Sequence, residues 1–235
     1  MKTLRKHLKN YGVKTSTVFD LPLYNMRLAL FSQLLIEEHK KVLAQLLSKP
    51  FDQVKFLYIN TPGNYKPYKS KWMTESETRW RRMFPQFQEF DIERAYRVDP
   101  AFDFKTFLSE FDFVFVSGGN TFILSYWMQK TGVREILKNL IIEDKVVYGG
   151  ESAGAVYVAK TVEFASDVDD PNKAPKQIDE GLGIVDFAIV PHWNTPEHQE
   201  LLEEMKRKYD ESGVKTYTLT DEQGLFVNGE EIVHI

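Results

Sequence analysis

The segment that most constrains the fold of this chain is Gly-Gly-Glu-Ser-Ala-Gly at residues 149–154. It directly follows the apolar run Val146-Val147-Tyr148. Because Gly150 and Gly154 carry no side chain, a strand and a helix can approach each other closely on either side of the serine. The sequence therefore predicts a strand, a sharp turn and a helix, which is the connection found in parallel α/β sheets.

The rest of the chain repeats this alternation of apolar runs of strand length with longer segments of helical period. We predict further strands at 27–31, 54–59, 113–116 and 184–190. The first helix should carry its apolar residues on one face, namely Leu34, Leu35, Val42, Leu43 and Leu46. The fold class predicted by this alternation is α/β, with a mostly parallel sheet flanked by helices on both faces.

Three further segments carry clear local signals. In the tryptophan-rich helical stretch 72–87, we expect Trp72, Trp80 and Phe84 to cover the sheet. Thr195 and Pro196 are the cap and first residue of a later helix, with the inward-facing residues Leu201, Leu202 and Met205. The chain ends in a predicted hairpin at 225–233, with Asn228-Gly229 as its two-residue turn.

The predicted elements assign residues 26–235 to a single α/β domain. Residues 1–25 form a predicted N-terminal extension, for which a solvated and flexible arm is expected. That extension is basic but contains no long apolar run, so it does not resemble a secretory signal. No segment has the roughly 20 apolar residues that span a bilayer. We expect a cytoplasmic protein without a membrane partner.

Charge and cysteine content exclude several classes of function. The chain has 30 basic and 34 acidic residues, a formal net charge of -4, and no cysteine. Mixed charges of this kind give no large positive field for a phosphate backbone, so nucleic acid is not an expected partner. Without cysteine, disulfides, thiolate metal sites and a cysteine nucleophile are all excluded.

Ser152 is the predicted nucleophile, because Gly-x-Ser-x-Gly between a strand and a helix is typical of a nucleophile elbow. A serine hydroxyl needs a general base at neutral pH, and histidine is the usual one. Of the five histidines, His192 alone directly follows an apolar strand, at the sheet edge where the elbow also ends. We therefore predict that His192 is the base.

The acid that orients the base is left open by the residues alone. Glu222 and its neighbour Asp221 lie in a turn after a predicted strand, whereas Asp167 lies downstream of the elbow helix. The oxyanion of an attacked carbonyl needs backbone N–H donors. Ala153 offers one at the start of the elbow helix, and the Gly118-Gly119-Asn120 turn after another strand offers a second.

Three segments, in order and at similar spacing, resemble the serine peptidases that include dipeptidase E, an aspartyl dipeptidase, and cyanophycinase. They are Gly118-Gly119-Asn120-Thr121, Gly150-Glu151-Ser152-Ala153-Gly154-Ala155 and Pro191-His192. The resemblance extends from about Met26 to the C-terminus. It implies a class I glutamine amidotransferase-like fold and hydrolysis of small peptides without a metal or organic cofactor.

By position, the resemblance implies Ser152 as nucleophile, His192 as base, and Gly119 with Ala153 as oxyanion donors. The acid of the family matches either Asp167 or Glu222, and we favour Glu222. Two departures bear on specificity for aspartyl dipeptides. Dipeptidase E has a tryptophan at the position of Glu151, and the loop Asp169-Asp170-Pro171 differs from its counterpart.

Two alternatives share the predicted fold. A glutamine amidotransferase uses a cysteine thiolate on the elbow, and the chain has no cysteine. A catalytically silent binding protein would keep the sheet edge only to hold a ligand. An acidic substrate would require a cation near Ser152, and Lys173 and Lys176 are the nearest candidates in the sequence. The sequence does not predict the oligomeric state.

Overall fold

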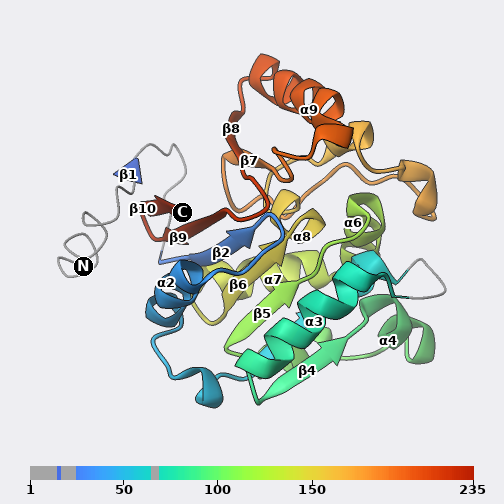
Figure 1. Ribbon diagram of the computed structural model, residues 1–235. Coiled ribbons are helices and arrows are strands. Elements are labelled where there is room, and N and C mark those ends of the chain that lie inside the picture. Colours follow the sequence, from blue (N-terminus) through green and yellow to red (C-terminus); the bar gives the residue numbers. More distant parts are fainter. Residues whose placement is uncertain (1–14, 17–24, 65–68) are drawn as a thin grey trace.

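The computed structural model describes residues 15–16, 25–64 and 69–235 (Figure 1). Its main feature is an eight-stranded sheet with the order β1-β10-β9-β2-β6-β5-β3-β4. The strands are β1 (Thr15–Ser16), β2 (Arg27–Phe31), β3 (Phe56–Ile59), β4 (Phe87–Phe90), β5 (Phe113–Val116), β6 (Val147–Glu151), β9 (Gly224–Asn228) and β10 (Glu231–His234). Strands β2, β6, β5, β3 and β4 run parallel, and the other three form an antiparallel edge. The predicted mostly parallel sheet is confirmed.

The C-terminal hairpin is confirmed, but its turn lies one residue later than predicted. Asn228 pairs with Glu231, so Gly229 and Glu230 form the turn. Gly229 has a φ of 58°, which glycine adopts without strain. On the outer side of the hairpin, Thr15–Ser16 pair with β10 although they lie inside the predicted N-terminal extension. The rest of that extension, residues 1–14 and 17–24, lies outside the described residues.

A second sheet contains only β7 (Phe187–Val190) and β8 (Lys215–Thr218), which run parallel to each other. Helix α9 (Gln199–Glu211) connects them, and the three elements form a group at the top of Figure 1. The sequence predicted the apolar run of β7 but not its separation from the main sheet. An apolar strand shows that it is buried, but it does not show which strand it pairs with.

Helices cover both faces of the main sheet, as predicted. One face carries α2 (Glu37–Leu47) and α3 (Lys71–Met83). This face is aromatic, and Phe56 stacks on Phe84 with ring centroids 4.5 Å apart. The other face is mostly aliphatic and packs against α6 (Thr121–Lys130), α7 (Val133–Ile142) and the short helix α8 (Ala153–Val156). Two small helices, α4 (Ile92–Val98) and α5 (Phe104–Leu108), follow β4.

Several predicted core positions are placed differently by the structure. Leu34 and Leu35 precede α2, because that helix begins at Glu37. Trp80 and Phe84 are buried as predicted, whereas Trp72 is 36% exposed. In α9, Leu202 and Met205 are buried but Leu201 is 44% exposed, because one position earlier on a helix points about 100° away.

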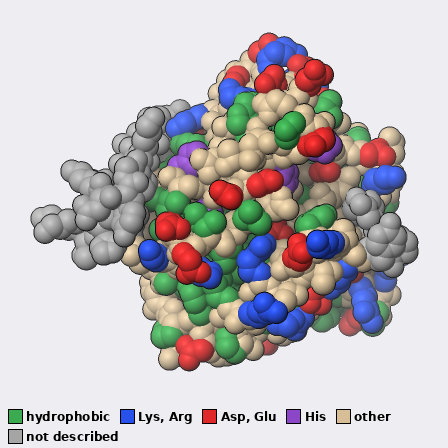
Figure 2. All heavy atoms as spheres, viewed as in Figure 1, with side chains coloured by type: hydrophobic (Ala, Val, Ile, Leu, Met, Phe, Trp, Pro, Cys, Tyr) green, Lys and Arg blue, Asp and Glu red, His purple; other side chains and the backbone are tan. Residues whose placement is uncertain are grey.

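The described surface mixes charges of both signs. Lys and Arg side chains gather over α3 in Figure 2 among carboxylates, and pairs such as Arg81 with Glu77 connect them.

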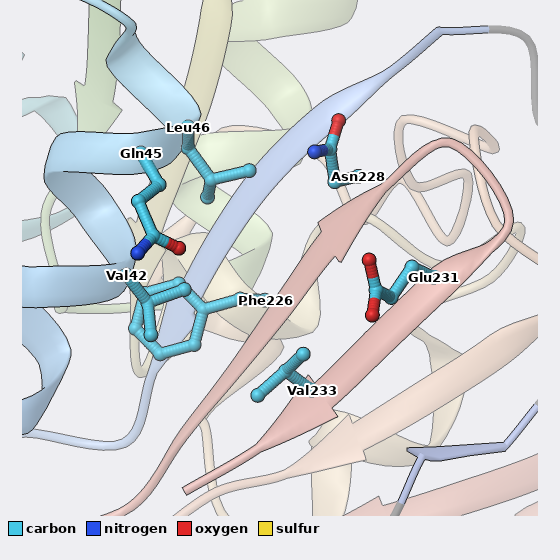
Figure 3. A pocket seen from close by; sticks show the side chains of 7 residues that line it. All are labelled: Val42, Gln45, Leu46, Phe226, Asn228, Glu231 and Val233. Carbon is cyan, nitrogen blue, oxygen red and sulfur yellow. The ribbon is translucent and has the colours of Figure 1, made fainter. Parts of the chain in front are cut away.

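A small hollow of about 10 Å³ lies between α2 and the hairpin, where Val42 and Leu46 face Phe226 and Val233 (Figure 3). It has room for about one water molecule. None of the described helices is long and apolar enough to span a membrane.

Candidate active site

Ser152 sits on the turn between β6 and α8, as the sequence predicts. Its φ of 50° and ψ of −113° are strained for a residue with a side chain. The flanking glycines are required by close packing. A Cβ on Gly150 would lie 2.4 Å from the backbone of Gly154, and one on Gly154 would lie 2.2 Å from the carbonyl oxygen of Val116. This packing holds the strained turn and presents the serine at the carboxyl end of β6.

His192 and Asp221 form a hydrogen-bonded chain with Ser152. His192 Nε2 lies 3.0 Å from Ser152 Oγ, and His192 Nδ1 lies 2.7 Å from Asp221 Oδ1. His192 follows β7 with a φ of 58°, and Asp221 lies in the turn after β8. A carboxylate on Nδ1 leaves the lone pair of Nε2 facing the serine hydroxyl. The structure thus brings the predicted nucleophile and the predicted base into contact.

The favoured acid, Glu222, is not the partner of His192. Glu222 is exposed, whereas the adjacent Asp221 points inward. The turn fixes this choice, because the Asp221 carbonyl oxygen accepts a 2.7 Å hydrogen bond from the Leu34 amide and its own amide donates to Asn194 Oδ1. The alternative Asp167 is also not at the site, since its Oδ1 lies 2.6 Å from Lys208 Nζ of α9. The carboxylate that contacts His192 in the structure is neither Glu222 nor Asp167 but Asp221, which the sequence left as an open candidate.

Ser32, directly after β2, is a member of the site that sequence reasoning missed. The His192 amide donates to Ser32 Oγ over 2.7 Å, and Ser32 Oγ donates to Asp221 Oδ1 over 3.2 Å. Ser32 is fully buried. One hydroxyl therefore connects the end of the main sheet to both His192 and Asp221. The only signal in the sequence is a polar residue at the carboxyl end of a buried strand.

Gly119 and Ala153, the predicted oxyanion donors, line the same cavity as Ser152. Gly119 has a φ of 145°, and a Cβ there would lie 2.1 Å from the Pro62 carbonyl oxygen, so this position requires glycine. A Cβ on the adjacent Gly118 would lie 3.1 Å from that of Ser152, so the glycine turn lies against the nucleophile. Ala153 is the first residue of α8. Both residues thus lie in the cavity that contains Ser152.

The cavity over Ser152 has a volume of about 440 Å³. One wall is aliphatic and consists of Val156, Ala165, Leu202 and Met205. Trp72 lines the same cavity, which explains why this tryptophan is not in the core. A space of this size with an apolar wall and a few polar groups is typical of a site for a small molecule or a short peptide.

Two more carboxylates line the cavity. Glu151 accepts hydrogen bonds from Ser76 Oγ at 2.7 and 2.8 Å and from the Gly118 amide, and it lies 3.9 Å from Arg79. Burial raises the pKa of the Glu151 carboxyl above its usual range, against the effect of these partners. Asp169 Oδ2 accepts from the amide and the hydroxyl of Thr121 at 2.8 and 2.6 Å. Burial also raises the pKa of Asp169.

The two lysines considered for an acidic substrate do not reach this cavity. Lys173 and Lys176 are exposed, and neither lines it. Lys173 instead lies 3.8 Å from Asp170.

The sequence profile of peptidase family S51 matches residues 37–235. The chain belongs to peptidase family S51. This confirms the resemblance to the dipeptidase E group. Among curated relatives, an uncharacterised peptidase of Listeria innocua is 31% identical over 52% of this chain and 58% of its own. Peptidase E of Streptomyces coelicolor is 35% identical over 54% of this chain and 53% of its own. The chain thus spans little more than half the length of these relatives.

Two solved structures are similar to this chain in fold. The crystal structure of a candidate peptidase E from Listeria monocytogenes has a TM-score of 0.72 at 21% identity and covers 89% of this chain and 98% of its own. A peptidase from an acI-B1 actinobacterium has a TM-score of 0.57 at 14% identity, over 90% of this chain and 86% of its own. At these identities the likeness concerns the fold.

Proposed function

We propose that this protein is a serine-type peptidase that hydrolyses small peptides, dipeptides among them, with Ser152, His192 and Asp221 as its catalytic residues. The observation that carries the proposal is the continuous hydrogen-bonded chain from Asp221 through His192 to Ser152. Membership of family S51 supports a peptidase, and the similarity to peptidase E of Streptomyces coelicolor supports small peptides as substrates.

In the proposed reaction, Ser152 Oγ attacks the scissile carbonyl carbon while His192 Nε2 takes the hydroxyl proton. The tetrahedral oxyanion accepts hydrogen bonds from the Gly119 and Ala153 amides. His192 then gives its proton to the leaving amine, and an acyl-enzyme remains on Ser152. Water, activated by the same histidine, hydrolyses this ester and restores the hydroxyl. Asp221 holds the imidazole by Nδ1 and stabilises its positive charge in both halves of the reaction.

The cavity supports a small substrate. Its volume of about 440 Å³ is that of a pocket for a small ligand and leaves little room for a long chain on both sides of Ser152.

The test is a dipeptide library assay on the wild-type protein and Ser152→Ala, with hydrolysis followed by chromatography. We expect turnover by the wild type and a loss of about 10⁴-fold or more in the variant, because the nucleophile is removed. A fluorophosphonate probe should label the wild type but not Ser152→Ala, while circular dichroism stays unchanged. Saturable peptide binding without labelling or turnover would instead favour the catalytically silent binding protein.

A further inference from the structure

The charged side chains of the candidate active-site cavity are mostly acidic. Its described lining residues include the carboxylates of Glu151, Asp169 and Asp221, together with the imidazoles of His192 and His198, and no lysine or arginine. Arg79 lies behind Glu151, where it also donates to the Gln33 carbonyl oxygen over 3.1 Å. The described part of this cavity therefore offers carboxylates that can bind a cationic group of a substrate.

The three carboxylates differ in the groups that they bind: Asp221 contacts the imidazole of His192, whereas Glu151 and Asp169 do not. Asp221 is engaged with His192 and Ser32, and both of these hydrogen bonds end on its Oδ1. Both oxygens of Glu151 accept from Ser76. In Asp169, both hydrogen bonds end on Oδ2, and Oδ1 makes none with any described residue. Asp169 thus presents an unpaired carboxylate oxygen in a cavity that also contains the nucleophile.

The Asp169 side chain is partly buried, and burial makes its charged form costly because the protein replaces part of its water. A cation from the substrate would relieve this cost through a charge-assisted hydrogen bond, which is stronger than a neutral one. The Asp169 amide donates to the carbonyl oxygen of Ala165 in η4 (Glu163–Asp167). Its Oδ2 accepts from Thr121 at the start of α6. Backbone and side chain of Asp169 are therefore both held in place. The second oxygen, Oδ1, therefore has a fixed position on a residue that lines the cavity.

Resting on the peptidase function proposed above, we propose that Asp169 binds the N-terminal ammonium group of the substrate, and that the first residue of preferred dipeptides is apolar. The ammonium group is the one cation that every unblocked dipeptide carries next to its scissile bond. The aliphatic wall of Val156, Ala165, Leu202 and Met205 offers a surface for an apolar side chain. An aspartyl side chain there would face carboxylates and lose its hydration without gaining a partner.

The test compares three substrates that share one leaving residue: Leu-Ala, N-acetyl-Leu-Ala and Asp-Ala. For the wild type we expect kcat/KM on Leu-Ala to exceed that on each of the other two by about 10- to 100-fold, the range for a lost hydrogen bond to a charged group. In Asp169→Asn, kcat/KM on Leu-Ala should fall toward the acetylated value, mainly through KM. The selectivity between Leu-Ala and N-acetyl-Leu-Ala should then shrink to near unity.

The matched control is Asp170→Asn, which removes the same charge one residue later on an exposed side chain. It should keep the selectivity of the wild type. Asparagine at 169 retains an oxygen for Thr121, so thermal unfolding and fluorophosphonate labelling of Ser152 should stay close to those of the wild type.

Two outcomes would overturn the inference alone: wild-type turnover that is faster on Asp-Ala, or a ratio of free to acetylated substrate that Asp169→Asn leaves unchanged. A protein that neither reacts with the probe nor cleaves any of the three peptides would overturn the proposed function and this inference with it.

Discussion

The candidate site combines two regions that hold their residues by different means. The main sheet presents Ser152 through its own backbone, in a strained turn that packed glycines enclose on both sides. The small β7-β8 sheet presents His192 and Asp221 from the ends of two strands, and side-chain hydrogen bonds align them. The nucleophile is therefore fixed locally, whereas the base depends on how the second sheet docks against the first.

Ser32 is where the two regions meet. Its hydroxyl contacts His192 and Asp221, and its amide donates to the Gln223 carbonyl oxygen over 3.2 Å. Two residues later, the Leu34 amide donates to the carbonyl oxygen of Asp221. The segment after β2 thus acts as the bridge from the main sheet to the β8 turn. Changes in the second sheet or in the segment after β2 should therefore alter catalysis without removing Ser152.

The largest effect expected from the second sheet is that of Asp221→Asn. An amide can hold the wrong tautomer of His192 and cannot stabilise the imidazolium, so kcat should fall by about 10²- to 10⁴-fold. Glu222→Gln, one residue later and exposed, should change kcat less than about twofold. Steady-state kinetics of both variants on one dipeptide decide which of the two residues acts as the acid. A larger loss in Glu222→Gln than in Asp221→Asn would restore Glu222 as the acid.

A smaller effect is expected from the bridge. Ser32→Ala removes an acceptor for the His192 amide and a donor to Asp221 without touching Ser152 Oγ. The loss of a buried hydroxyl with two partners should lower kcat by roughly 10-fold and the free energy of unfolding by about 1–3 kcal/mol. Kinetics and denaturant unfolding measure the two. Unchanged kinetics would mean that the second sheet docks independently of this bridge.

The sequence predicts the locally determined half of the site much better than the other half. Glycine spacing around Ser152 and the end of an apolar strand before His192 are properties of a few consecutive residues. The choice of Asp221 over Glu222 depends on contacts with Asn194 and Leu34, which lie far away in the chain. Ser32 becomes informative only once β7 and β8 are known to pack against the end of β2.

The fold, like the site, is predicted where it depends on consecutive residues and not where it depends on contacts far away in the chain. Apolar periodicity predicts the strands of the main sheet and the helices on its faces, because burial leaves a regular pattern. It does not predict that β7 leaves the main sheet to pair with β8, because pairing partners are not encoded in the pattern of one strand.

The main-sheet region should make the free energy of unfolding sensitive to acid. His39 of α2 is buried against Phe31 and Phe226, and this burial lowers its pKa below the ordinary value of 6.5. The unfolded chain then binds a proton that the folded chain does not, so the free energy of unfolding falls as the pH drops below about 6.5. The slope is at most about 1.4 kcal/mol per pH unit for one group. Denaturant unfolding at pH 7.5 and 5.5 measures it, and His39→Gln should flatten the dependence.

The exposed His198 provides a control for this experiment. His198→Gln should leave the acid-dependent loss of stability in place. Burial also lowers the pKa of His234, so part of the dependence should persist in His39→Gln. A full wild-type slope in His39→Gln would show that acid acts elsewhere than in the aromatic face of the main sheet.

The smallest effect separates structure from catalysis at α9, the helix that connects β7 and β8. Asp167 pairs with Lys208 of α9 across a partly exposed contact of 2.6 Å, and ion pairs of this kind contribute about 1 kcal/mol or less. Asp167→Asn should therefore lower the melting temperature by only a few degrees and leave kcat/KM unchanged, since the pair holds α9 and does not reach His192. Lys208→Met removes the other partner and should give the same two results. A loss of kcat in Asp167→Asn but not in Lys208→Met would mean that Asp167 acts on the base directly, and the assignment to Asp221 would fall.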